Sequence, residues 1–186
     1  NIVPSAFGNA GQKCSACSLL LVERSVYEDE NFRSKLKDAA TSLKTGSVWN
    51  AGNIVGPMIT NKNDKLLQAF NLEPGESWLV PPRFIDEKEY MLAPTVKWGV
   101  KPENFSFRTE LFGPLLSVAC IENLEEGIKL VNGLDYGLTS GLQSLDEKEQ
   151  KLWKNSVMAG NLYINRGITG AIVNRQPFGG MKLSAF

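Results

Sequence analysis

The chain has 186 residues, of which 42% are hydrophobic and 22% charged, a composition that is sufficient for one domain with a buried core. Twenty basic and twenty acidic residues give a formal net charge of zero. With no block of one charge sign, the sequence argues against nucleic acid or an anionic membrane as a partner. It also lacks a signal-peptide pattern and any apolar run near the roughly 18–20 residues of a transmembrane segment, so we expect a cytoplasmic protein.

Three cysteines and no histidine restrict the possible chemistry. A Cys–His or Ser–His dyad within this chain is excluded. Cys14 and Cys17 form a C-x-x-C pair, but a zinc site needs about four ligands and only Cys120 could join them, so we expect no metal. Thiol–disulfide exchange remains an alternative for the pair, although such motifs follow a strand and here a strand-like run comes after it.

The predicted elements alternate between helix and strand along most of the chain. Helical structure beginning near Pro4 should approach the thiol and be interrupted by Gly11. A loop is expected between Gly46 and Pro57, followed by a short helix that Asn61 could cap. The remaining helices are predicted at 26–44, 124–132 and 146–156, and the strands at 18–23, 78–80, 95–98, 115–121, 138–144 and 161–165. This alternation predicts an α/β fold, a mostly parallel sheet with helices on both faces.

Two glycine-rich bends, at 167–172 and 176–180, follow the last predicted strand. Open α/β sheets bind their ligands at the carboxyl ends of strands, so these bends are a candidate ligand site. Cys120 lies inside an apolar run and is expected to be a core residue. Cys14 follows a Gly-Gln-Lys turn, where Lys13 and free backbone N–H groups would favour the thiolate. From residue type alone, the bends could be ordinary surface loops and Cys14 a small buried hydrophobe.

Three strings, GQKC at 11–14, ELFGP at 110–114 and PFGG at 177–180, resemble the aldehyde dehydrogenase superfamily and occur in its order. The resemblance covers nearly the whole chain. Four longer strings resemble the Δ1-pyrroline-5-carboxylate dehydrogenase branch, in particular the dehydrogenase part of bifunctional proline utilisation A enzymes. These strings are SLDE at 144–147, GNLYINR at 160–166, TGAIV at 169–173 and RQPFGG at 175–180.

The resemblance implies the catalytic and cofactor residues. Cys14 would attack the aldehyde of glutamate γ-semialdehyde, hydride would pass to NAD, and the resulting thioester would be hydrolysed to glutamate in proline catabolism. Glu110 would accept hydrogen bonds from the nicotinamide ribose, and Phe112 would pack near the nicotinamide. The choice between NAD and NADP stays open, because the residues that would meet the adenosine ribose are not in this sequence.

The resemblance also implies how the small-molecule aldehyde substrate is held. The backbone N–H groups of Gly170 and Ala171 would take its carboxylate, assisted by Ser15, while Phe178 would pack on the aliphatic part. Gly170 can adopt the backbone angles that such an anion-binding turn needs. If the loop merely turns, aldehydes without a carboxylate should react about as well.

Within this resemblance, residues 1–186 correspond to an excised catalytic domain. The Rossmann domain, the general base and the side-chain oxyanion donor would lie upstream, and a C-terminal oligomerisation segment downstream. We therefore expect the isolated chain to be inactive, and the parent to be a homo-oligomer that binds FAD only if it also carries a proline dehydrogenase domain. The alternative is a non-catalytic binding or assembly domain that keeps the fold, which would have no chemical need for both Cys14 and Glu110.

Overall fold

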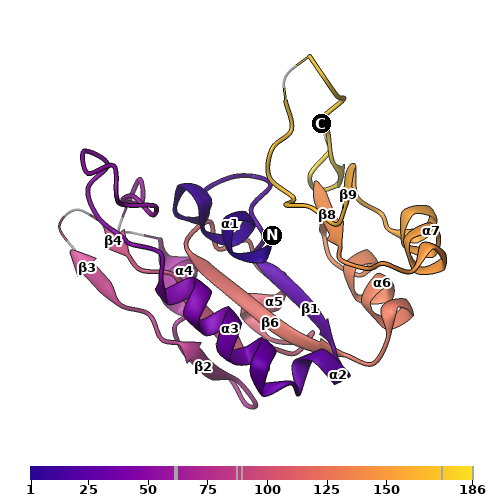
Figure 1. Cartoon of the computed structure of the whole chain (residues 1–186), viewed down its shortest axis with the longest axis horizontal. Coiled ribbons are helices and arrows are strands. Elements are labelled where there is room, and N and C mark those ends of the chain that lie inside the picture. The colour runs from indigo at the N-terminus through magenta and orange to yellow at the C-terminus, as the bar shows by residue number, and fades with distance from the viewer. Residues whose placement is uncertain (61–62, 87, 89, 173, 186) are drawn as a thin grey trace.

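A computed structural model describes residues 1–60, 63–86, 88, 90–172 and 174–185 of the chain. Its centre is a four-stranded sheet in the order β1-β6-β5-β2 (Figure 1). The strands are β1 (Leu19–Glu23), β2 (Ser77–Val80), β5 (Thr95–Trp98) and β6 (Leu115–Ile121). β6 runs parallel to both β1 and β5, and only the edge strand β2 is antiparallel to its neighbour. The predicted, mostly parallel α/β sheet is confirmed.

Helices cover both faces of this sheet because the side chains of β1 alternate between two cores. Leu20 and Val22 belong to the large core that includes residues of α1 (Ile2–Phe7) and α3 (Glu30–Thr41). Leu19 and Leu21 instead pack in a smaller core with residues of α5 (Phe105–Arg108) and α6 (Leu124–Asn132). Since the faces of β6 are covered on both sides, its sequence is a nearly continuous apolar run.

The last third of the chain, from α6 (Leu124–Asn132) onward, forms a smaller unit beside the sheet, drawn in orange and yellow in Figure 1. β8 (Thr139–Leu142) and β9 (Asn161–Ile164) pair in parallel, and β7 (Tyr136–Gly137) pairs with β10 (Met181–Lys182). α6 and α7 (Glu147–Ser156) pack on each other around a core of Ile128, Trp153, Val157 and Ala159. Within the described residues, β8 is hydrogen-bonded to β9 and not to the central sheet.

The remaining elements are short. They are the 3₁₀ segment η1 (Gly8–Gly11), the helices α2 (Arg24–Tyr27) and α4 (Asp64–Gln68), and the hairpin strands β3 (Phe84–Asp86) and β4 (Met91–Leu92). In the part of the chain that the structure describes, no helix has both the length and the apolar character that crossing a bilayer requires.

One predicted element needs correction. The single helix expected over 26–44 is two helices, because Asp29 adopts an extended backbone and its side chain accepts the N–H of Asn31, which starts α3. Asn61, the expected cap of the short helix, lies outside the described residues, and the side chain of Asn63 accepts the Leu66 N–H at the start of α4. Helical structure before the thiol ends as α1 at Phe7 and continues only as η1.

Candidate active site

Cys14 lies in a tight turn between η1 and β1, and its side chain is exposed. The turn is closed by the Ala16 N–H, which donates to the Lys13 carbonyl at 3.0 Å. One residue farther, the Cys17 N–H donates to the Ser5 carbonyl at 2.9 Å, which fixes the end of the turn to α1. The thiol is therefore presented to solvent on a loop that is anchored at its base.

The backbone before the thiol is held in an uncommon conformation. Asn9, Ala10 and Gly11 all have positive φ angles, of 54°, 55° and 67°. Two of them are not glycine, and such residues persist in this region only where their surroundings fix them. A Cβ on Gly11 would lie 2.3 Å from the Gly113 carbonyl oxygen, so only glycine permits this contact between the two backbones. The thiol turn and the turn at residues 110–113 are thus in direct contact.

Glu110 and Phe112 occupy that second turn, between α5 and β6. Both side chains are exposed, and both line the same cavity of about 750 Å³ as Cys14 and Phe178. The structure therefore brings together the predicted nucleophile, the two predicted cofactor residues and one predicted substrate residue. An exposed carboxylate and a ring beside a thiol fit the ribose and nicotinamide of NAD, which are the parts that the resemblance assigns to them.

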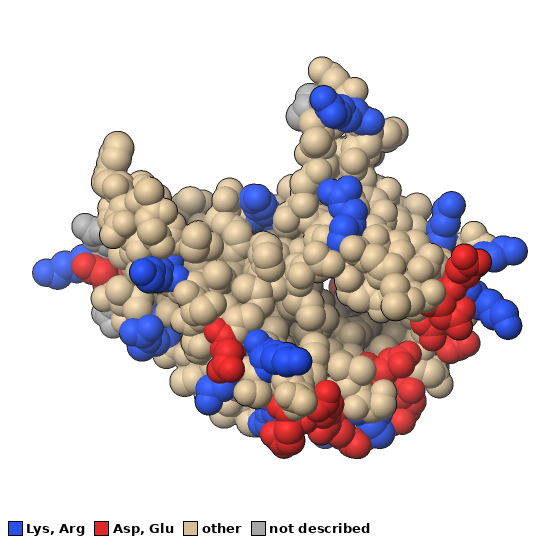
Figure 2. Space-filling view, in the orientation of Figure 1, with Lys and Arg blue, Asp and Glu red and all other residues tan. Residues whose placement is uncertain are grey.

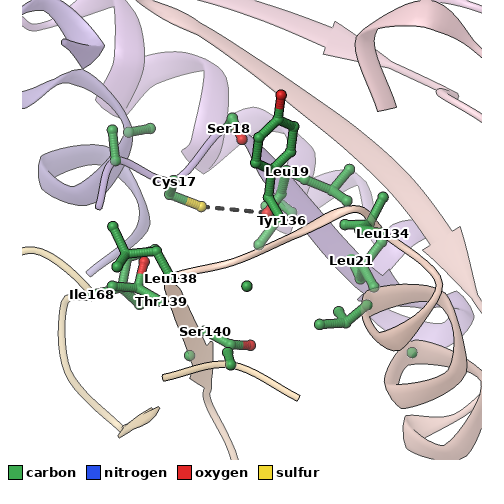
Figure 3. A pocket seen from close by; sticks show the side chains of 18 of the residues that line it. Cys17, Ser18, Leu19, Leu21, Leu134, Tyr136, Leu138, Thr139, Ser140 and Ile168 are labelled. Carbon is green, nitrogen blue, oxygen red and sulfur yellow. Dashed lines mark hydrogen bonds between the residues drawn. The ribbon is translucent and has the colours of Figure 1, made fainter. Parts of the chain in front are cut away.

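The cavity continues between the edge of the central sheet and the smaller unit. Figure 3 shows Leu19 and Leu21 of β1 on one side and the segment Leu138, Thr139 and Ser140 at the start of β8 opposite them. This part of the lining is largely apolar, which suits the aliphatic portion of a substrate better than its charged end.

The other predicted substrate residues lie outside the lining of the cavity. Ser15 belongs to the thiol turn itself, and its side chain is buried. Gly170 and Ala171 belong to the 167–172 loop, where Gly170 is exposed with a φ of 125°. Ser5 was not predicted from the sequence, yet it connects the two loops, because its hydroxyl accepts the Ile168 N–H at 3.1 Å while its carbonyl accepts the Cys17 N–H.

The loop that carries Phe178 is held against β9. The Asn161 side chain donates to the Gly179 carbonyl at 2.8 Å, and the Gln176 side chain donates to the Tyr163 hydroxyl at 3.2 Å. A Cβ on Gly160 would lie 1.8 Å from the Gly179 carbonyl oxygen, so this crossing also requires glycine. Hydrogen bonds therefore attach the loop to β9 both before and after Phe178.

The other two cysteines differ from Cys14 in their environment. Cys17 is half-buried, its thiol donates to the Leu19 carbonyl at 3.5 Å, and burial raises its pKa to about 12. Cys120, expected in the core, is half-buried in β6, and its pKa is raised chiefly by burial. Both stay neutral thiols near pH 7, which leaves Cys14 as the exposed candidate nucleophile. Among the described residues, no group of Cys, Asp and Glu side chains is arranged to hold a metal ion.

Charge is distributed unevenly along the chain. No aspartate or glutamate occurs after Glu149, whereas five basic residues do: Lys151, Lys154, Arg166, Arg175 and Lys182. In Figure 2 the projecting loop at the top carries basic side chains, and acidic side chains gather along the lower and right edges. A loop that carries basic side chains and no carboxylate favours an anionic ligand over a cationic one.

Comparison with known proteins agrees with this geometry. The model of the aldehyde dehydrogenase family matches residues 1–186. A 1-pyrroline-5-carboxylate dehydrogenase from Staphylococcus haemolyticus is 35% identical over 99% of this chain, which covers 36% of that protein. One from Staphylococcus aureus is 36% identical over 98% of the chain and 35% of its own length. The chain thus spans about a third of the length of these relatives.

Solved structures show the same fold. Proline utilization A from Corynebacterium freiburgense superposes with a TM-score of 0.92 and 43% identity, over 98% of this chain and 19% of that one. The 1-pyrroline-5-carboxylate dehydrogenase from Thermus with bound NAD gives a TM-score of 0.89 and 34% identity, over 98% and 35%. With an exposed thiol held against the ELFGP turn and a family model matched from end to end, the chain belongs to the aldehyde dehydrogenase family.

Proposed function

We propose that the intact protein oxidises glutamate γ-semialdehyde to glutamate with NAD, and that Cys14 is its nucleophile. The observation that supports the proposal is the contact between the backbone before Cys14 and the turn of Glu110 and Phe112, whose side chains line the same cavity as Cys14. The names of the relatives agree with this substrate. The buried Cys17 thiol, with its raised pKa, argues against dithiol exchange.

In the proposed reaction the Cys14 sulfur attacks the carbonyl carbon of the aldehyde, and the oxygen becomes an oxyanion to which the backbone N–H of Cys14 can donate. When bound, NAD supplies the acceptor for the hydride that leaves this carbon. The carbonyl then re-forms as a thioester on Cys14. Water attacks the thioester and releases the glutamate product and the free thiolate, with two protons lost to solvent over the cycle.

The domain organisation of the intact protein is part of the proposal. Residues 1–186 would form the catalytic domain that carries the nucleophile, and a Rossmann domain elsewhere in the protein would bind most of the dinucleotide. Glu110 and Phe112 can meet only its nicotinamide end. FAD would be bound only by a protein that also has a proline dehydrogenase domain, and assembly into a homo-oligomer and a location in the cytoplasm remain predictions.

The proposed anchor for the substrate carboxylate is the backbone of Gly170 and Ala171, with Ser15 and Phe178 assisting. Two observations support it. Ser5 ties the 167–172 loop to the base of the thiol turn, and the chain has no acidic residue after Glu149 to repel a carboxylate. A concave turn of backbone N–H groups binds an anion without an arginine.

This anchor predicts a preference for the carboxylated substrate. Because charge-assisted hydrogen bonds contribute about 1.5–3 kcal/mol each, kcat/KM for glutamate γ-semialdehyde should exceed that for butanal by roughly 10- to 100-fold or more. Ala171→Pro, which removes one N–H, should lower kcat/KM for the semialdehyde and spare butanal, while Ala171→Gly keeps the N–H and serves as the control. Steady-state NADH formation by the intact protein measures both ratios. An equal loss on the two aldehydes would show that the loop does not hold the carboxylate.

A further inference from the structure

We propose that Gln12 is a positioning residue that sets the Cys14 thiol against the nicotinamide-facing turn, an inference that rests on the proposed function. Its side-chain amide joins three segments that are far apart in the sequence. The Nε2 atom donates to the Phe112 carbonyl at 3.2 Å, and the Oε1 atom accepts the Ile59 N–H at 3.0 Å. Both ends of one amide are thus used to bridge the thiol turn to its neighbours.

The turn that Gln12 holds is one that needs support. Phe112 has a φ of 48°, an uncommon conformation for an aromatic residue, and it persists only where neighbours fix it. In the same turn, the Leu111 carbonyl accepts a hydrogen bond from the Asn63 side chain at 2.6 Å. Gln12 and Asn63 therefore donate to two successive carbonyls of the turn from two different segments. Of the two, Gln12 is the one that directly precedes the thiol turn.

The thiol itself has little packing of its own. Lys13 and Cys14 are both exposed, and the residues before them adopt left-handed backbone angles up to Gly11. A hydrogen bond to α1 fixes the end of the thiol turn, and its placement against Phe112 depends on the close approach of Gly11 to Gly113 and on the bridge of Gln12. Hydride transfer depends steeply on such placement, since a displacement of about 1 Å can cost on the order of 100-fold in rate.

Gln12→Leu and Gln12→Glu separate the two bonds of the bridge. Leucine removes both. Glutamate keeps an acceptor for the Ile59 N–H but turns a carboxylate oxygen toward the Phe112 carbonyl, so it cannot donate there. Gln150→Leu is the matched control, because that side-chain amide also donates to a backbone carbonyl, of Ser144 at 2.8 Å, but lies in α7 away from the thiol.

In the intact protein, both Gln12 variants should lower kcat about 10-fold or more with KM for the aldehyde changed less than about threefold. Substrate deuterated at the aldehyde carbon should show a larger isotope effect on kcat than in wild type, because hydride transfer becomes slower. Alkylation of Cys14 by iodoacetamide should stay within about threefold of wild type, because the thiol itself is unchanged. Gln150→Leu should match wild type in all three measurements.

A merely structural role would give a different pattern, in which activity, alkylation and thermal stability fall together, and that pattern would overturn the proposal. Full activity in Gln12→Glu would also overturn it, since the Phe112 bond would then be dispensable. Hydrogen exchange provides a readout that needs no turnover: Gln12→Leu should speed exchange of the Ile59 amide, and unchanged exchange would refute the bridge. If the Ile59 amide of the wild-type protein is protected from exchange but the protein oxidises no aldehyde, the proposed function, and not the bridge, would be refuted.

Discussion

Replacing Cys14 with alanine in the intact protein is expected to lower kcat for aldehyde oxidation on the order of 10⁴-fold or more, which in practice abolishes NADH formation. Alanine removes the sulfur that forms the covalent bond to the substrate carbon, and no other described cysteine is exposed. Folding should be unaffected, because the side chain is exposed and lies in a turn closed by backbone hydrogen bonds. The measurement is the initial rate of NADH formation with glutamate γ-semialdehyde.

Cys17→Ala is the control for this prediction. Its thiol is half-buried, and burial raises its pKa to about 12, so it stays protonated at the pH of the assay. Most of the activity should remain after its replacement. If both variants lost activity equally, the two thiols would be acting as a pair, and the nucleophile assignment would be wrong.

Breaking the buried ion pair between Lys97 and Glu76 should destabilise the chain by about 3–5 kcal/mol, the typical cost of leaving one buried charge without its partner. The side chains are 1% and 0% exposed, and the Lys97 Nζ lies 2.8 Å from the Glu76 Oε2. Lys97 also donates to the Asn71 carbonyl at 3.0 Å and lies 5.4 Å from the centroid of the Trp78 ring. The test measures the free energy of unfolding of Glu76→Gln, Lys97→Met and wild type by urea denaturation.

A double variant and a control variant in an exposed ion pair test this prediction further. The double variant should lose less stability than the sum of the losses in the two single variants, because it leaves neither charge without its partner. Glu122→Gln removes the partner of Arg24 in an exposed pair, where solvent screens the charges, and should lower the stability far less than either buried variant. A loss below about 1 kcal/mol for Glu76→Gln would contradict the buried pair.

The elements that the sequence predicted well are those whose signals are local. α6 matches its predicted bounds because Asn123 caps it, accepting the Glu126 N–H at 2.9 Å, and α7 begins where Asp146 accepts the Lys148 N–H at 2.7 Å. β6 was predicted from a continuous apolar run that burial on both faces explains. The division of the helix at Asp29 was missed because all the apolar positions that predicted the helix, from Phe32 to Leu43, lie after it, and their periodicity does not report where the helix is capped.

The site shows the same division between local and distant signals. Cys14, Glu110 and Phe112 were predicted because short strings carry them, and the structure places them on one cavity. The roles of Ser5 and Gln12 were not predicted, since their hydrogen bonds join residues 163 and 100 positions apart. Only the fold brings such partners together, and the same holds for the pairing of Lys97 with Glu76.

The most direct test of the account is to find the covalent intermediate. The intact protein is mixed with NAD and glutamate γ-semialdehyde, quenched in acid within milliseconds, digested, and analysed by tandem mass spectrometry. The expected result is a glutamyl thioester on Cys14 that is absent when NAD is omitted. An acyl group on Cys17 or Cys120, or NADH formed with no acylated cysteine in the quenched protein, would contradict it.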